Sequence, residues 1–281
     1  MKTKDIKTIL FPTDFSDGSV DALHFAVDLT KRTNSKLILL SVVDTPFNFN
    51  VENEPVDIDL ITYDLIGFSE SNLNRLKDLI KEKNSVQIDT ATYTGETTSS
   101  IVKAVHNFKA DLVIMGTKVS KDLFFKSSSF NIVKNTGVPM LTINEGGAPS
   151  SIKNILFPFN ENFSTLQKAE GALQLAKLFN AKITLLGVSE ANSPEKIRNI
   201  TNNMLIIKDV FDKNQIPSEV HFSSDKDYSH AILDHCEQNQ IDLVTVANNL
   251  KTSLLESNRV LPAKKVMNNS KIPVLTIPVL R

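Results

Sequence analysis

The sequence has one cysteine, no tryptophan and three tyrosines among its 281 residues. Because Cys236 is the single cysteine, the chain cannot form an internal disulfide, and we expect a protein of a reducing compartment, the cytoplasm. No apolar run approaches the roughly 20 residues of a membrane helix, and the N-terminal residues do not read as a signal peptide. The formal net charge of −1 gives no reason to expect binding to nucleic acid or to a membrane.

Three short blocks occur twice, in the same order. Residues 9–14 (ILFPTD), 111–113 and 138–143 return as residues 155–160 (ILFPFN), 242–244 and 272–277. A repeat of this length indicates a duplicated domain, because solenoid repeats are usually about 20–50 residues long. We therefore predict one domain at 1–145 and a second at 151–281, with a flexible break at Gly146-Gly147-Ala148-Pro149.

Each copy alternates short apolar runs with helical patterns. In the first copy we expect strands at 8–12, 36–43, 87–93, 112–115 and 139–143, helices beginning near residues 16, 64 and 99, and a fourth helix that contains residues 131–135. The second copy repeats the order from residue 154 to residue 277. Strict alternation predicts an α/β fold: two tandem domains, each a doubly wound parallel sheet with right-handed crossovers.

The first copy carries an extra stretch, residues 45–61. It contains Glu52, Glu54, Asp57 and Asp59 and no basic residue. Two interpretations stand: a solvated connection, or an acidic lid or partner-docking loop.

The repeated blocks resemble the universal stress protein family. The resemblance lies in Ile9–Asp14, the Gly95 turn, the block Ala110–Thr117 and Val138–Leu141, and it covers both halves. It implies a five-stranded sheet of order 3-2-1-4-5 in each domain, as in adenine nucleotide alpha hydrolase-like folds, and a cytoplasmic role in stress survival. Single-domain relatives dimerise through the fifth strand. We therefore predict that the two halves pack as an internal pseudo-dimer, and a homodimer of the whole chain or an unknown protein partner is also plausible.

In the order 3-2-1-4-5, a ligand crevice forms where the winding reverses, at the loops after strands 1 and 4. The nucleotide-binding branch of the family has an acidic residue after strand 1 and a G-x2-G-x9-G-[S/T] loop after strand 4. Glycines there let backbone N–H groups approach phosphate oxygens. The first half keeps Asp14 and Gly116, but Val119 stands at the second glycine, and Ser129 or Lys126 at the third.

The matching residues of the first half are the candidate nucleotide-binding or anion-binding set: Asp14, Gly116, Thr117, Lys118, Ser127 and Ser128. Each also has a structural interpretation. Asp14 can cap the first helix, Gly116 can be a turn with positive φ, and the serines can cap a helix.

The second half departs further from the family pattern. Its loop after strand 4 has Ala247, Leu250, Val260 and Leu261 at the glycine and Ser/Thr positions, and Asn160 replaces the acid. Branched side chains would occupy the space that phosphates need. We therefore expect a degenerate site there and a scaffolding role.

The remaining residues indicate no catalytic set. His221, His230, His235 and Cys236 are ligand types suited to zinc, but they lie on separate elements or unfavourable spacings, so zinc is a minor alternative. The favoured hypothesis is a non-enzymatic regulatory module of the stress response without a cofactor. The alternative is an ATP-binding sensor or weak ATPase that uses the first half alone.

Overall fold

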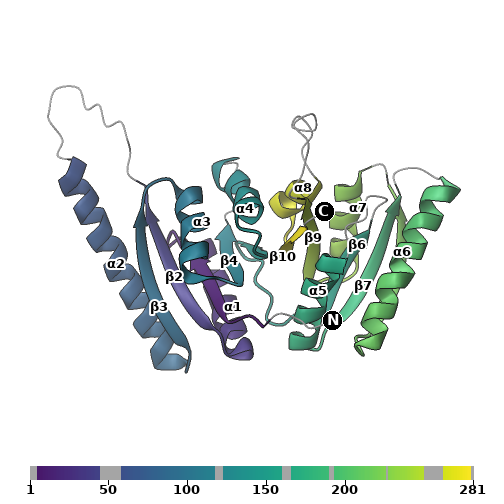
Figure 1. Ribbon diagram of the computed structural model, residues 1–281, viewed down its shortest axis with the longest axis horizontal. Coiled ribbons are helices and arrows are strands. Elements are labelled where there is room, and N and C mark those ends of the chain that lie inside the picture. Colours follow the sequence, from purple (N-terminus) through teal and green to yellow (C-terminus); the bar gives the residue numbers. More distant parts are fainter. Residues whose placement is uncertain are drawn as a thin grey trace.

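The computed structural model describes residues 5–44, 58–117, 123–159, 166–189, 193–225, 227–249 and 262–279. Strands and helices alternate along the whole chain (Figure 1). The first half contains β1 (Thr8–Pro12), α1 (Asp17–Thr33), β2 (Lys36–Val43), α2 (Ile58–Lys83), β3 (Gln87–Thr94), α3 (Thr97–Phe108), β4 (Leu112–Thr117), α4 (Leu123–Thr136) and β5 (Met140–Asn144). The second contains β6 (Asn154–Phe159), α5 (Leu166–Phe179), β7 (Lys182–Ser189), α6 (Pro194–Lys213), β8 (Ser218–Ser224), α7 (Tyr228–Gln238), β9 (Leu243–Asn249), α8 (Pro262–Asn269) and β10 (Val274–Val279).

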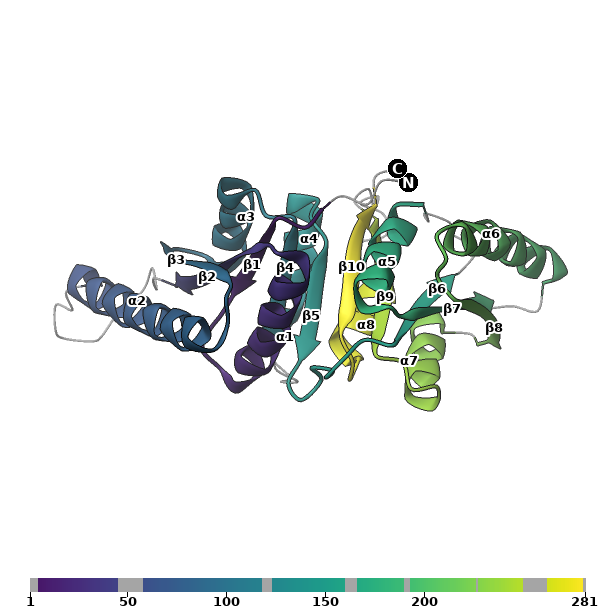
Figure 2. The same cartoon turned by 90° about the horizontal axis from the view of Figure 1, so that it is seen from below.

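All ten strands form one sheet, in the order β3-β2-β1-β4-β5-β10-β9-β6-β7-β8. Each half has the predicted order 3-2-1-4-5, and the strands within each half run parallel. Figure 2 shows β5 and β10 side by side at the centre of the molecule, with α2 and α6 toward its two ends. The prediction of two doubly wound domains packed as an internal pseudo-dimer is confirmed.

The two halves join through an antiparallel ladder. Leu141 of β5 is paired with Leu275 of β10, and Met140 with Thr276. In a separated half, β5 or β10 would be a sheet edge with unpaired backbone groups. Pairing the two edges satisfies these groups and buries the side chains between the flanking helices.

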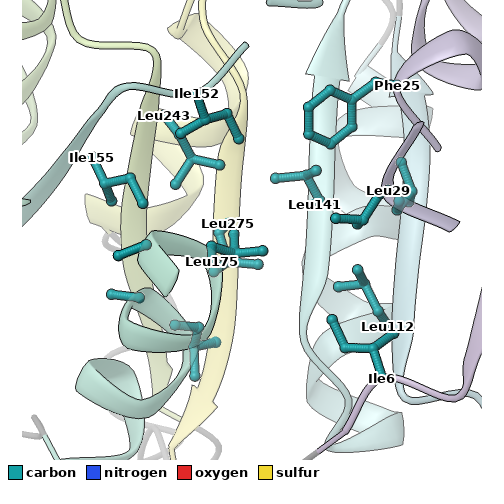
Figure 3. Packing of buried hydrophobic residues seen from close by; sticks show 14 of the residues in the cluster. Ile6, Phe25, Leu29, Leu112, Leu141, Ile152, Ile155, Leu175, Leu243 and Leu275 are labelled. Atoms are coloured by element: carbon teal, nitrogen blue, oxygen red, sulfur yellow. The ribbon is translucent and has the colours of Figure 1, made fainter. Parts of the chain in front are cut away.

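A single hydrophobic cluster crosses this ladder on one face of the sheet. It combines residues of α1, α2, α5 and α6 with the inward side chains of strands from both halves. Figure 3 shows part of it, with Phe25, Leu29 and Leu141 on one side of the seam and Leu175 and Leu275 on the other. On the opposite face, α3 and α4 cover one cluster, and α7 and α8 cover another that also includes Phe130 of α4.

One helix begins earlier than the sequence pattern suggested. Helix α2 begins at Ile58, so residues 58–61 of the acidic stretch are helical rather than loop. Ile58, Ile61 and Leu65 continue the helical spacing, which explains the longer helix. Helix α4 spans Leu123–Thr136 and contains residues 131–135, as expected. Residues 45–57, with Glu52, Glu54 and Asp57, lie outside the described part of the chain.

Candidate functional site in the crevice between β1 and β4

Strands β1 and β4 are neighbours at the point where the strand order reverses. The structure brings Asp14 and Gly116 together there, and Ser19 in the first turn of α1 links them. The Ser19 hydroxyl donates to Asp14 Oδ1 at 2.6 Å, and the Ser19 backbone lies against Gly116. The structure therefore places Asp14 and Gly116 close together at the position predicted for the crevice.

The Asp14 carboxylate accepts hydrogen bonds from the residues at the start of α1. Its Oδ1 receives the backbone N–H of Ser16 at 3.0 Å, the Ser16 hydroxyl at 2.5 Å and the Ser19 hydroxyl. Partial burial raises the pKa of Asp14, but these hydrogen bonds outweigh that effect and hold the pKa below its usual value. Ser16 is the N-cap residue of α1 and its own side chain makes no capping bond, so Asp14 organises this turn in its place.

Gly116 does not form a turn with positive φ, and that structural interpretation of it was wrong. Gly116 lies within β4, and the glycines with positive φ are Gly95, Gly137 and Gly146. A methyl group at Gly116 would lie 2.3 Å from the carbonyl oxygen of Gly18 and 2.7 Å from Cα of Ser19. Glycine is required because the first turn of α1 touches the backbone of β4 at this point.

Thr117 is bonded to the neighbouring strand. Its hydroxyl donates to the side-chain oxygen of Asn144, at the end of β5, and its backbone oxygen accepts from the N–H of Glu145 at 3.0 Å. Asn144 is 6% exposed and donates its amide to the backbone oxygen of Ser270 in the second half at 2.5 Å. Thr117 is thus connected, through Asn144, to the interface between the halves.

The remaining candidates are less well placed. Lys118 lies outside the described residues, as do Val119, Asn160 and residues 250–261. Ser127 and Ser128 fall within α4 rather than at its start, so they are not its N-terminal caps, and their side chains lie outside the described part. Ser129 is buried at 2% exposure. The lysine-and-serine anion site thus stays a prediction.

The second half contains a buried lysine that the sequence reasoning missed. Lys168 of α5 lies 146 residues after Ala22 of α1, so an alignment of the two copies places a lysine where the first copy has a buried alanine. Its side chain is 4% exposed; Nζ donates to the backbone oxygen of Pro158 and lies 4.1 Å from the centre of the Phe157 ring. Burial lowers the pKa of Lys168 to about 7. This ammonium group occupies the carboxyl end of β6, which corresponds to the Asp14 end of β1.

The possible zinc ligands do not converge. His230 pairs with Asp225, with Nδ1 and Oδ2 2.7 Å apart, whereas His221 packs edge-on against His235 with ring centres 5.3 Å apart. Cys236 is buried, and burial raises the pKa of its thiol to about 12. In the part of the chain that the structure describes, no group of three or more His, Cys, Asp or Glu side chains is placed to hold a metal ion. The same part contains no helix that is both long and apolar enough to cross a membrane.

Comparison with known proteins places the chain in a family. The family model of the universal stress protein family matches residues 5–144. A universal stress protein of Methanocaldococcus jannaschii is 29% identical over 140 residues, which cover 49% of this chain and 81% of that protein.

Solved structures share the tandem arrangement. A universal stress protein from Archaeoglobus fulgidus DSM 4304 is similar with a TM-score of 0.77 at 19% identity, covering 96% of this chain and 98% of its own. A protein of unknown function from Pseudomonas aeruginosa PAO1 has a TM-score of 0.63 at 13% identity, covering 98% and 93%. At these identities the likeness shows the fold alone. The family model matches the first copy, and the second copy has the same fold. The chain therefore belongs to the universal stress protein family, as a tandem member.

Proposed function

We propose that this protein is a non-enzymatic regulatory module whose two nucleotide sites have largely degenerated. It would act in the cytoplasm through contacts with a protein partner, without a cofactor. The observation that carries the proposal is the way the crevice residues of the first half bind one another. Asp14 Oδ1 accepts three hydrogen bonds from Ser16 and Ser19, and the first turn of α1 lies directly on Gly116.

The second half supports the same conclusion. Ala247 stands in β9 at the first glycine position of the family pattern, and Lys168 is held beneath the end of β6 by a backbone oxygen and two aromatic rings. A phosphate-binding loop needs glycines that expose backbone N–H groups. Positions filled by alanine and branched apolar residues cannot provide this.

Exposed apolar side chains support a role in protein binding. Among the described residues, nine of the ten large hydrophobic side chains that are exposed lie on three elements at the ends of the sheet: Tyr63, Leu65, Phe68 and Leu79 on α2, Ile197, Leu205 and Ile206 on α6, and Val220 and Phe222 on β8. Apolar groups gathered on surface elements are typical of interaction surfaces.

The deciding experiment measures nucleotide binding directly. Protein purified without added nucleotide is denatured and the supernatant is tested for released nucleotide, and the melting temperature of native protein is followed with MgATP. We expect no released nucleotide and no shift in melting temperature at millimolar ATP, because a ligand stabilises only the state it binds.

The alternative function, an ATP-binding sensor or weak ATPase of the first half, predicts the opposite result. Stabilisation by ATP that is lost in Asp14→Ala but kept in Asp64→Ala would establish it and overturn the proposal. Asp64 is a matched control because it is an exposed carboxylate on α2, away from the crevice.

A further inference from the structure

The end strand β8 is open along its outer side. In the part of the chain that the structure describes, β7 is the one strand beside it. The backbone oxygen of Pro217, just before β8, accepts the N–H of Ile183 in β7 at 2.9 Å. Backbone groups of successive residues in a strand point to opposite sides, so every second residue from Pro217 onward faces β7. The residues between them, Ser218, Val220 and Phe222, direct their N–H and C=O groups outward, away from β7.

The outer side of β8 is apolar on the face that α6 covers. Phe222 is 48% exposed, and Val220 is also exposed. A methyl group on Gly187 of β7 would lie 2.7 Å from the Phe222 ring and 2.8 Å from the sulfur of Met204, so the ring lies next to α6. Side chains alternate along a strand, so Val220 points to the same face as Phe222. The row of outward backbone groups is therefore bordered by exposed apolar side chains.

Helix α6 extends this apolar surface. Asp212, near its C-terminal end, accepts the hydroxyl of Ser218 with the two oxygens 3.3 Å apart, so that side of α6 faces β8. Leu205 lies about two helical turns before Asp212 and is therefore on the same side. Leu205 is also exposed. Val220, Phe222 and Leu205 thus border the open edge on one face of the sheet.

The other end strand of the sheet, β3, is protected against pairing. Figure 2 shows it at the opposite end of the molecule. Its Ile88 is buried, none of the exposed large apolar side chains of the described residues lies on it, and Asp89 forms an ion pair with Lys36 of β2 at 2.5 Å. Native proteins usually protect free edges with charges, lysine or proline, or cover them. Residues 218–224 of β8 contain no lysine and no proline, so this edge is suited to pairing.

A second copy of the chain supplies a strand that fits this edge. The seam between the halves already pairs two edges of this fold in the antiparallel direction, β5 with β10. Antiparallel pairing of β8 with itself places a two-fold axis between the strands and gives a closed dimer. Pairing of β8 with β3 of the next molecule would instead give an open filament.

We propose that two copies of the chain form a dimer through antiparallel pairing of β8, with Val220 of one copy opposite Val220 of the other. In this register Ser218 lies opposite Phe222, and these three residues form hydrogen bonds through their outward N–H and C=O groups. On the other face of the sheet, Glu219 of each copy lies opposite His221 of the other copy. Such side chains approach closely, with Cα atoms about 4.5 Å apart, and a carboxylate and an imidazole are complementary. The dimer goes beyond the proposed function and does not depend on nucleotide binding in the crevice.

The helices leave room for this pairing. Helix α6 packs mainly on β7 and less on β8. The two β7 strands of the dimer would be three strand spacings apart, about 14 Å, whereas packed helices have axes about 8–10 Å apart. The α6 helices of the two copies therefore do not collide, and Leu205 and Phe222 of both copies occupy the space between them.

Sedimentation equilibrium of the full chain between about 1 and 300 µM tests the dimer. One pair of short strands buries an area at the low end for specific interfaces, below about 1,200 Å², so we expect a reversible monomer–dimer equilibrium with a dissociation constant in the micromolar range. A single species of monomer mass over the whole range would overturn the proposal. Assemblies that grow beyond the dimer with concentration would overturn it too, because they indicate an open, head-to-tail contact.

Val220→Lys tests the position of the axis. Two ammonium groups would lie opposite each other across the axis, and lysine is a residue that protects natural edges in this way. We expect the dissociation constant to rise at least about tenfold, with the fold of the monomer kept because Val220 is already 40% exposed. Val20→Lys is the matched control, since Val20 on α1 is 42% exposed and lies in the other half, and its dimerisation should be unchanged. Equal dissociation constants in Val220→Lys and the wild type would refute the proposal.

Two substitutions at His221 test the register. His221→Glu and His221→Lys both remove the ring contact with His235, so they differ in the charge that faces Glu219 of the other copy. We expect His221→Glu to weaken the dimer and His221→Lys to keep or strengthen it, with dissociation constants at least about threefold apart. Equal dissociation constants in these two variants would overturn the proposed pairing.

Discussion

Asn144 donates its side-chain amide to the backbone oxygen of Ser270, and this hydrogen bond joins the two halves of the chain. Asn144 also accepts the hydroxyl of Thr117, so a single buried side chain connects the end of β4 to the segment before β10. The interface between the halves is therefore polar at this end, whereas Leu141 and Leu275 form its apolar centre.

Asn144→Asp is expected to weaken the interface between the halves. The substitution keeps the shape of the side chain but removes the donor, which leaves the oxygen of Ser270 without its partner and buries a carboxylate. We expect the free energy of unfolding to fall by about 1–3 kcal/mol in urea titrations at pH 7. Asn131→Asp makes the same change at an exposed position of α4 and should leave stability nearly unaltered. Equal effects in the two variants would contradict the role of Asn144.

Gly116→Ala and Gly67→Ala are expected to change stability in opposite directions. A methyl group at Gly116 would meet the backbone of α1 at 2.3 Å, so the helix or the strand must move, and we expect a loss of about 3 kcal/mol. At Gly67, in the middle of α2, nothing lies within 4 Å, and alanine should add about 0.5–1 kcal/mol through helix propensity. Thermal or urea unfolding of both variants tests the contact, and a neutral Gly116→Ala would disprove it.

Lys168 is expected to make stability depend on pH. Its pKa in the folded protein is about 7, below the value of 10.5 for an exposed lysine, so the unfolded chain binds more protons between these values. The cost of burying this amine is therefore largest below pH 7 and is relieved as the pH rises toward 10.5, by roughly 5 kcal/mol in total.

Lys168→Met tests this dependence. The variant should be more stable than the wild type at pH 6, and the difference should shrink as the pH approaches 10, in urea unfolding curves at several pH values. Lys177→Met, on the exposed side of the same helix, serves as the control. A stability difference between Lys168→Met and wild type that does not vary with pH would show that the lysine keeps its charge.

Asp14→Ala is expected to cost stability whether or not nucleotide is present. Because the pKa of Asp14 is lowered in the folded protein, its hydrogen bonds to Ser16 and Ser19 stabilise the fold at neutral pH, and this stabilisation is lost as the pH falls through the lowered pKa. We expect a loss of about 1 kcal/mol at pH 7, as for a helix cap, which disappears at acid pH once the carboxylate is protonated in the folded protein. Asp64→Ala should show no such loss in the same urea titrations.

The sequence allowed the fold to be predicted in some detail. The apolar runs of β1 and β6 repeat almost letter for letter, and a buried parallel strand tolerates few alternatives because both its faces are packed. The αL residues Asn34 and Asn180, which end α1 and α5, are also 146 residues apart and have φ values of 50° and 52°. Local chemistry of this kind can be read directly from residue types.

The candidate site could be predicted only in part. The positions of Asp14 and Gly116 followed from the strand order, but the sequence allowed both a ligand-binding and a structural role for each. The choice between them depends on distances, such as 2.6 Å from Ser19 Oγ to Asp14 Oδ1.

The sequence by itself determined the duplication and the alternation of strands and helices, because these depend on repeated residue types and on local periodicity. Its resemblance to the universal stress protein family implied the strand order and the glycine positions that this chain has lost. Only the tertiary structure decided that Asp14 is bonded to the first turn of α1 and that Lys168 is buried against Phe157. The physical reason is that burial, hydrogen-bond pairing and free volume arise between elements distant in the chain, and single positions carry no record of them.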